Sequence, residues 1–206
     1  MLRIWGRTNS INVQKVMWTV GELGLAHERI DAGGAFGGLD TPEYGTLNPN
    51  RKVPTIDDDG AVLWESNACV RYLAARYGAG SLWPEDVKRR GQSDLWMDWQ
   101  QTTLLPDMTV VFWGLIRTPE AQRDLAAIKV AAERLGATWR VLDQHLATRR
   151  FVTGDSLTMG DIPVGAACYR YYGLPIARPQ LPNLEEWYER LTERPAFREH
   201  VMLPIT

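Results

Sequence analysis

The stretch "LRIWGRTNSINVQKVMWTV", residues 2–20, changes from the pattern of a strand to the pattern of a helix within one short loop. The apolar run from Leu2 to Trp5 ends at Gly6, and a polar loop follows from Arg7 to Asn12. Beyond the loop, apolar residues recur three and four positions apart, at Val13, Val16, Met17, Val20 and Leu23. A helix with one apolar face has this spacing. The stretch therefore predicts a β-strand that leads directly into an amphipathic helix.

Further segments continue this alternation as far as residue 78. They are a short strand at "HERIDA" (27–32), a turn of helix near 42–47, a hairpin at "VPTIDDDGAVLW" (53–64) and a helix at "ESNACVRYLAARYG" (65–78). Asp59 and Gly60 supply the two-residue turn that hairpins favour. The order is strand, helix, strand, short helix, two strands and helix. It predicts a small α/β domain with a mixed sheet over residues 1–78.

The remainder of the chain has no strand pattern. Residues 79–87 are rich in Gly, Ser and Pro and are typical of a linker between domains. Helical apolar spacing then runs through 89–115 and 119–147, and through the shorter segments 161–172 and 183–191. The sequence therefore predicts an α/β domain followed by an all-helical domain over residues 88–206.

The overall composition narrows the possible partners. With 206 residues and a net charge of −2, the chain lacks the positive charge that nucleic acids or acidic membrane surfaces require. It begins without a basic and apolar leader and has no apolar run long enough to cross a membrane, so we expect a cytoplasmic protein. Cys69 and Cys168 are far apart, which favours two buried side chains over a metal site or a disulfide.

The loop "LNPNRKVPTI" (47–56) carries a proline at the entrance to a strand. Because proline cannot donate to a sheet ladder, Pro54 is expected at a sheet edge or in a cis turn. A cis Pro54 would leave the backbone N–H and C=O of Val53 free to pair with an extended peptide. The alternative, an ordinary strand that starts at a proline, fits the fragment equally well.

Two further loops carry polar residues that suit a peptide ligand. Glu65 and Ser66 start a helix, where free N–H groups attract a carboxylate and the acidic side chain attracts an ammonium group. Arg51 and Lys52 could hold a second carboxylate. A plain helix cap at Ser66 and a solvated pair at Arg51 and Lys52 are the simpler alternatives. Together the loops describe a slot for a short peptide such as glutathione.

The chain resembles the glutathione transferases, and in particular their serine-type, theta-like branch. The resemblance rests on "SINVQKV" after the first strand, "NPNRKVPTI" as the cis-proline motif, "LWESNACVRYLAARYG", "WQQTTLLPDMTVVFW" and the capping-box motif "LTMGDIP". It covers nearly the whole chain. It implies a thioredoxin-like domain followed by a helical domain, glutathione as co-substrate with no other cofactor and no metal, and a homodimer.

The resemblance also implies an activity, the conjugation of glutathione to small hydrophobic electrophiles. Glutathione-dependent disulfide exchange and a non-catalytic binding role remain alternatives, because a fold alone does not decide function. The glutathione-binding residues would be Arg51, Lys52, Val53, Pro54, Glu65 and Ser66.

Ser10 and Asn12 are the candidate catalytic residues. Ser10 stands where the first helix begins, so its hydroxyl and the helix N-terminus could together stabilise a thiolate. Asn12 matches the position at which some bacterial relatives direct an amide toward the sulfur. The simpler alternatives are that Ser10 caps the helix and that Asn12 is a residue of its first turn. No Tyr or Cys takes the place of Ser10, which excludes the tyrosine and cysteine branches.

The electrophile pocket is expected between the two domains. Trp113 matches an aromatic position on the long helix, and Phe36 lies in a loop flanked by glycines that could fold over the site. That loop, "GGAFGG" (33–38), departs from the theta-type pattern, in which a His often precedes the Asn-Pro pair.

Overall fold

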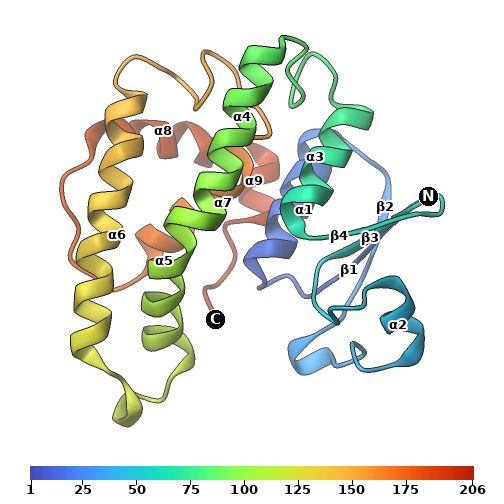
Figure 1. The fold of residues 1–206 in the computed structure, drawn as a ribbon, viewed down its shortest axis with the longest axis horizontal. Coiled ribbons are helices and arrows are strands. Elements are labelled where there is room, and N and C mark those ends of the chain that lie inside the picture. Colours follow the sequence, from blue (N-terminus) through green and yellow to red (C-terminus); the bar gives the residue numbers. More distant parts are fainter.

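The computed structural model describes residues 1–206, which form a sheet-containing domain and a helical domain packed side by side (Figure 1). The first domain contains β1 (Leu2–Trp5), α1 (Ile11–Glu22), β2 (His27–Ile30), η1 (Gly34–Phe36), α2 (Pro42–Leu47), β3 (Thr55–Asp58), β4 (Ala61–Trp64) and α3 (Ser66–Tyr77). The predicted order of elements is confirmed, and a short 3-10 turn, η1, is added within the Gly-rich loop.

The four strands form one sheet in the order β2-β1-β3-β4. β1 runs parallel to β2, whereas the pairs β1–β3 and β3–β4 are antiparallel, so the sheet is mixed as predicted. Ile4 in β1 lies opposite Ile56 in β3, and both side chains are fully buried. They pack with Val13, Val16 and Leu73 of α1 and α3, which pack together on this face of the sheet. This small core fixes the position at which α1 begins.

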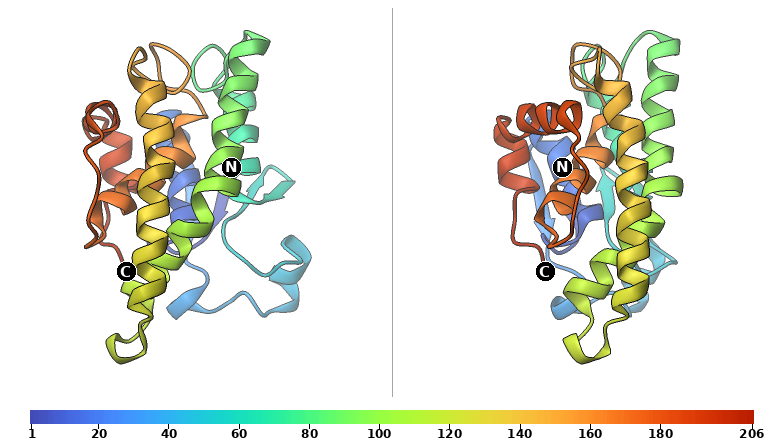
Figure 2. Two further views of the ribbon diagram at one scale, coloured as in Figure 1. Left: turned by 60° about the vertical axis from the view of Figure 1, so that its left-hand side comes forward. Right: turned by 90° about the vertical axis from the view of Figure 1, so that its left-hand side faces the viewer.

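The second domain is built from helices alone. It contains α4 (Val87–Trp99), η2 (Gln100–Leu104), α5 (Leu105–Phe112), η3 (Trp113–Arg117), η4 (Glu120–Gln122), α6 (Leu125–Leu146), α7 (Asp161–Gly173), α8 (Pro182–Thr192) and α9 (Pro195–His200). Figure 2 shows α6 antiparallel to the long helical rod that α4 and α5 form. None of these helices combines the length and the apolar character needed to span a membrane.

Two boundaries differ from the sequence-based expectation. The helix expected from residue 119 begins at Leu125, because the Asp124 side chain accepts a hydrogen bond from the Ala127 backbone N–H and caps the helix there. Helix α9 was not predicted. Its six residues are too few to display a helical period, and Pro195 at its first turn resembles a loop signal.

The helical pattern over 89–115 corresponds to α4 and α5, joined through η2, a π-helical segment. Pro106 explains the wider turns of η2, which end just before it. Proline has no N–H to donate to the carbonyl four residues earlier, and its ring would clash with that carbonyl in a regular helix. A π segment relieves this conflict without breaking the rod.

The core of the helical domain extends into the first domain. Trp18 of α1 is fully buried and packs edge-on against Phe197 of α9, with ring centroids 4.7 Å apart. On the other side, a Cβ placed on Gly165 of α7 would lie 2.8 Å from the Trp18 ring, so only glycine permits this approach. Helix α1 is therefore enclosed between the sheet and the helical domain, which makes the boundary between the domains rigid.

The predicted capping motif lies at the buried start of α7. The Asp161 carboxylate accepts hydrogen bonds from the backbone N–H groups of Val152 and Thr158 and from the Trp187 indole, each 2.9 to 3.0 Å long. Complete burial raises the pKa of Asp161 to about 6, although these donors act in the opposite direction. Cys69 and Cys168 are buried and unpaired, as expected.

Candidate functional site

The loop between β1 and α1 presents Ser10 at the start of the helix. Its backbone takes an extended conformation (φ −85°, ψ 120°), and its carbonyl accepts the first helical hydrogen bond from the Gln14 N–H. The Ser10 hydroxyl makes no capping hydrogen bond and has no other partner within the chain. The interpretation of Ser10 as a side-chain cap is therefore wrong, and its hydroxyl is free to bind a ligand.

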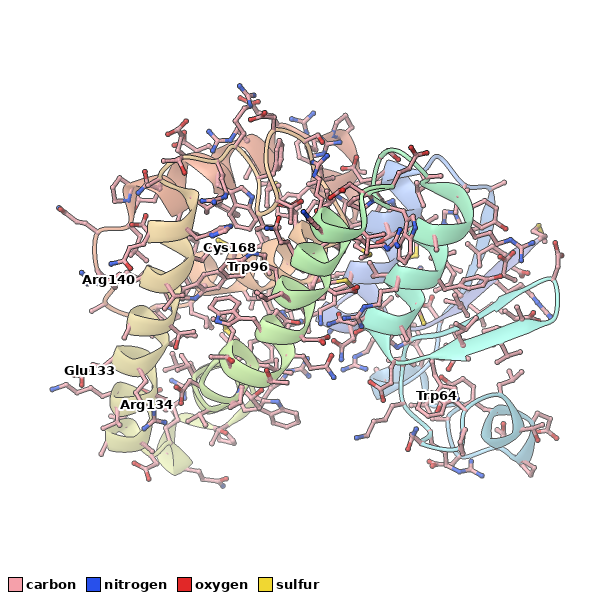
Figure 3. All side chains as sticks on the ribbon, turned by 45° about the horizontal axis from the view of Figure 1, so that its top comes forward. Trp64, Trp96, Glu133, Arg134, Arg140 and Cys168 are labelled. Carbon is pink, nitrogen blue, oxygen red and sulfur yellow. The ribbon has the colours of Figure 1, made fainter.

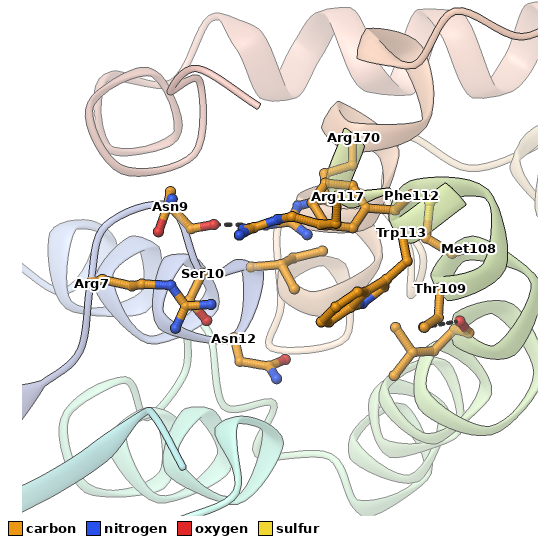
Figure 4. A pocket seen from close by; sticks show the side chains of 12 residues that line it. Arg7, Asn9, Ser10, Asn12, Met108, Thr109, Phe112, Trp113, Arg117 and Arg170 are labelled. Carbon is orange, nitrogen blue, oxygen red and sulfur yellow. Dashed lines mark hydrogen bonds between the residues drawn. The ribbon is translucent and has the colours of Figure 1, made fainter. Parts of the chain in front are cut away.

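A cavity of about 270 Å³ opens beside this hydroxyl, between the N-terminus of α1 and the rod formed by α5 and η3 (Figure 4). One face of the rod supplies Leu105, Met108, Thr109, Phe112 and Trp113, which follow the spacing of a single helical stripe. Ser10 and Asn12 line the opposite wall. The structure thus brings both candidate catalytic residues together with Trp113, although they are about a hundred residues apart in the sequence.

Asn12 lies in the first turn of α1, which was the simpler of its two sequence interpretations. Its side chain also lines the cavity. Its Oδ1 accepts a hydrogen bond of 3.2 Å from the Ser66 hydroxyl, which ties the start of α3 to the start of α1. The Asn12 Nδ2 donates no hydrogen bond within the chain and remains available. Ser66 itself does not cap α3, because Glu65 occupies the N-cap position with a left-handed φ of 65°. Glu65 and Ser66 lie outside the cavity, one contact away through Asn12.

The peptide bond between Val53 and Pro54 is cis, as one of the two sequence interpretations required. The backbone N–H and C=O of Val53 have no hydrogen-bond partner within the chain. The loop is held from behind by buried Tyr44 and Asn48, whose hydroxyl and amide donate to the Lys52 carbonyl at 2.7 and 2.9 Å. This arrangement presents the Val53 backbone at the edge of the domain.

Arg51 and Lys52 have different surroundings. Arg51 Nη1 donates to the carbonyls of Leu39 and Thr41, both at 2.9 Å, so its guanidinium group braces the segment between the Gly-rich loop and α2. The Lys52 side chain is exposed and makes no hydrogen bond or ion pair. Of the two cations proposed for a second carboxylate, Lys52 is therefore the free one.

Phe36 lies outside the cavity that contains Ser10 and Trp113. It lines an adjoining hollow of about 450 Å³ that shares Arg7, Asn9 and Arg117 with that cavity. Gly34 in the same loop has a φ of 59°, and a Cβ there would meet the Arg7 side chain at 3.0 Å. The Gly-rich loop that departs from the theta-type pattern therefore makes room for Arg7.

Sequence reasoning missed three arginines of the cavity wall, Arg7, Arg117 and Arg170. Arg7 stands three residues before Ser10 in the same loop, and this short separation could have identified Arg7 as a residue of the site. Arg117 and Arg170 come from η3 and α7, and only the packing of the helical domain brings them to the site. Burial, together with the neighbouring charges of Arg117 and Arg7, lowers the pKa of Arg170 to about 10.

Lys15 was missed as well, and it lies fully buried where the two domains meet. Its Nζ donates to Gln100 Oε1 of the rod at 2.9 Å and approaches Asn67 Oδ1 of α3 at 3.5 Å. Burial and the nearby Arg170 lower the pKa of Lys15 to about 7, while Glu65 acts in the opposite direction. The Lys15 amine and two amides thus connect α1, α3 and the rod behind the site.

The residues of the cavity wall are suited to stabilise an anion. The wall contains no His, Asp or Glu, so it has no carboxylate or imidazole to act as a general base for Ser10. Free N–H groups at the start of α1, the Ser10 hydroxyl and three guanidinium groups all favour negative charge here. The chain contains no cluster of three or more His, Cys, Asp or Glu side chains placed to hold a metal ion.

Comparison with known proteins gives consistent results. Residues 9–76 match the family model of the glutathione S-transferase N-terminal domain, and residues 119–190 match that of the C-terminal domain. Glutathione S-transferase GstB of Escherichia coli K12 is 42% identical over 208 residues, which cover 100% of both chains. Glutathione S-transferase 3 of Zea mays is 27% identical and covers 97% of this chain and 93% of its own.

A solved structure is also similar along the whole chain. The theta class glutathione S-transferase of Xanthomonas axonopodis pv. citri, crystallised with glutathione bound, superposes with a TM-score of 0.96. It is 47% identical in sequence and covers 100% of this chain and 99% of its own. The match includes both domains and their relative arrangement.

Proposed function

The chain belongs to the glutathione S-transferase family, and we propose that it conjugates the glutathione thiolate to small hydrophobic electrophiles. The observation that carries the proposal is the Ser10 hydroxyl, which has no partner within the chain and lines a cavity without a general base. Such a hydroxyl can donate a hydrogen bond to a thiolate but is poorly suited to act as a nucleophile.

In the proposed pose, glutathione runs along the edge of the first domain. Its glutamyl ammonium pairs with Glu65, and its glutamyl carboxylate accepts from Ser66 and the free N–H groups at the start of α3. The cysteinyl backbone pairs with the free N–H and C=O of Val53, as an added strand would. The glycyl carboxylate lies near Lys52. This pose directs the sulfur toward Ser10.

The chemistry follows from the stabilised thiolate. A free thiol has a pKa of about 8.5, and a shift of one pKa unit corresponds to about 1.4 kcal/mol. A hydrogen bond to a charged group contributes roughly 1.5 to 3 kcal/mol, so the Ser10 hydroxyl and the α1 N-terminus together make the thiolate the main form near neutral pH. The sulfur then forms a bond to the electrophilic carbon, and the leaving group departs with the bonding electron pair.

The electrophile is held by the apolar stripe of the rod. Trp113 is 60% exposed and faces the cavity, so it offers an uncovered aromatic surface to a planar substrate. Phe36, 58% exposed in the adjoining hollow, is placed to cover a substrate that extends past Arg7. These two residues form the proposed second-substrate pocket.

A second candidate function rests on Asn12. Its Nδ2 is unpartnered and faces the same cavity, so it could donate to the sulfur in place of Ser10. We associate this arrangement with glutathione-dependent disulfide exchange, in which the thiolate attacks a disulfide sulfur and releases the other half as a thiolate.

A panel of substrates tests these proposals. The purified chain is retained on immobilised glutathione and then assayed with an aryl halide, an epoxide and a mixed disulfide of glutathione. Turnover of the first two supports conjugation, and turnover of the disulfide alone supports exchange. Retention on the column with no turnover of any substrate would identify a binding protein and contradict the proposed activity.

We also propose that the protein works in the cytoplasm as a two-fold homodimer. Two buried, unpaired cysteines suit a reducing compartment. A homodimer is the arrangement implied by the family, with the first domain of one subunit against the helical domain of the other. A monomeric mass in sedimentation at micromolar concentration would contradict it.

A further inference from the structure

Three guanidinium groups converge on the cavity where the electrophile is expected. Arg7 enters from the loop before α1, Arg117 from the end of the rod and Arg170 from α7 (Figure 4). No acidic side chain is among the twelve residues that line this cavity. The three positive charges therefore face one another without a carboxylate between them, which makes this wall strongly electropositive.

Arg170 is the most constrained of the three. Only 8% of it is exposed, and it stacks over the Phe112 ring with its Cζ 4.3 Å from the ring centroid. It donates one hydrogen bond, from Nη2 to the Asn9 carbonyl at 2.9 Å, and it has no ion-pair partner. A buried guanidinium carries five N–H donors, so most of its capacity is unused by the chain.

Arg7 and Arg117 complete the group at the rim. Arg7 is half-buried against Gly33 and Gly34, and this burial, together with the charge of Arg117, lowers its pKa. Arg117 is exposed, donates to a main-chain oxygen of Thr206, the last residue of the sequence, and lies over Phe112 with its Cζ 5.6 Å from the ring centroid. The charge of Arg117 disfavours the charged forms of both Arg7 and Arg170, and no carboxylate side chain lines the cavity.

Two half-buried arginines elsewhere in the chain show the usual arrangement, a carboxylate partner. Arg194 holds Glu22 with two hydrogen bonds at the junction of α8 and α9 with α1. Arg71 holds Asp94 and Asp98 on α4. An unpaired buried charge is costly, so buried Arg170, with two further guanidinium groups beside it and no carboxylate side chain in the cavity wall, indicates a site whose anion comes from outside the chain.

We propose that the second substrate of this enzyme carries a carboxylate, which Arg117, Arg170 and Arg7 bind while its electrophilic carbon faces the sulfur at Ser10. This inference rests on the proposed conjugation activity and specifies its substrate class. The apolar stripe with Trp113 holds the body of the substrate, and the arginines hold one end. The substrate is thereby fixed at two points, which orients its carbon for attack.

A matched pair of aryl chlorides provides the test. 4-Chloro-3-nitrobenzoate and 4-chloro-3-nitrobenzamide have the same leaving group and nearly the same shape, but only the first is an anion. In both, the sulfur bonds to the ring carbon that bears chlorine, and chloride leaves with the bonding electron pair. Each kcat/KM is divided by the rate of the uncatalysed reaction with glutathione at the same pH, which removes the intrinsic difference in reactivity.

We expect the corrected kcat/KM to be at least tenfold higher for the benzoate, which is about 1.4 kcal/mol. Arg117→Gln should lower this ratio at least tenfold, whereas Arg117→Lys should retain most of it because it keeps the charge. Arg117 is exposed, so neither change is expected to prevent folding. Arg140→Gln is the matched control, because Arg140 extends from α6 far from the cavity and makes no hydrogen bond (Figure 3).

Each of the following results would overturn the inference. A corrected ratio near one in the unmodified enzyme would mean that the arginines do not select an anion. An equal loss of activity on both substrates in Arg117→Gln would mean that Arg117 stabilises the thiolate instead. Weaker glutathione binding in Arg117→Gln by calorimetry would assign the arginine to glutathione. If neither chloride is turned over while other electrophiles are, the carboxylate inference fails alone; if no electrophile is conjugated, the proposed function fails with it.

Discussion

Replacing Ser10 by Ala removes a hydroxyl that has no partner within the chain. A serine that caps a helix loses about 1 kcal/mol of stability when changed to alanine. Because the Ser10 hydroxyl makes no capping bond, Ser10→Ala should leave the free energy of unfolding almost unchanged. The effect should appear in chemistry alone, which separates a catalytic role from a structural one.

The magnitude follows from the hydrogen bond that the sulfur would lose. At roughly 1.5 to 3 kcal/mol for a bond to a charged group, Ser10→Ala should lower kcat/KM for conjugation roughly ten- to a hundredfold. The same loss of thiolate stabilisation should raise the pKa of the bound glutathione thiol by about one to two units. Glutathione affinity should change little, because the glutamyl and cysteinyl contacts remain.

The assay is an ultraviolet titration of the thiolate in the enzyme–glutathione complex, with kcat/KM measured alongside. Thr8→Ala is the matched control, because Thr8 lies in the same loop, is exposed and does not line the Ser10 cavity. An unmoved titration in Ser10→Ala would refute this reasoning. If Asn12→Ala shifts the titration instead, Asn12 is the partner of the sulfur, and disulfide exchange becomes the favoured activity.

Three further changes test the surroundings of the site. Glu65→Gln combined with Ser66→Ala should weaken glutathione binding by more than about 2 kcal/mol, and unchanged affinity in calorimetry would exclude the proposed pose. The pKa of Lys15 falls from 10.5 to about 7, so the folded chain holds this proton less tightly than the unfolded chain. The unfolding free energy should therefore rise from pH 7 to 10, and urea titrations of Lys15→Met should show a smaller rise; an equal rise would contradict the buried-amine account. The pKa of Asp161 is raised from 3.8 to about 6, so its contribution to stability is present below pH 4 and is lost as the pH rises through 6. Carbon NMR should detect this titration, whose absence near pH 6 would contradict the shift, and Asp161→Ala should destabilise by more than about 3 kcal/mol, because several buried donors lose their acceptor.

The sequence predicted the elements that local patterns determine. Three short-range signals are the change from a strand pattern to a helix pattern after Gly6, the Asp59-Gly60 turn and the Glu-Ser pair at the start of α3. The fold class derived from them is confirmed. Ser10 could be found because it stands where the strand pattern changes to the helix pattern. These features depend on neighbours along the chain, so no tertiary information was needed.

Tertiary packing explains what the sequence did not reveal. Residues 13 to 20 of α1 are all buried, because the sheet covers one side of the helix and the helical domain covers the other. The apolar spacing revealed only the side that faces the sheet, so Lys15 resembled a solvated residue. Arg117 and Arg170 reach the cavity from distant helices, and no local pattern marks them. The site is therefore more electropositive than the net charge of −2 suggests.

The central claim is that glutathione places its sulfur at Ser10, with its S-substituent on the stripe of the rod. A crystal structure of the chain with S-hexylglutathione tests this most directly. We expect the sulfur within hydrogen-bond distance of Ser10 Oγ, the glutamyl group at Glu65 and Ser66, and the hexyl chain against Trp113. A sulfur bound away from the start of α1, with Ser10 still unpartnered, would contradict it.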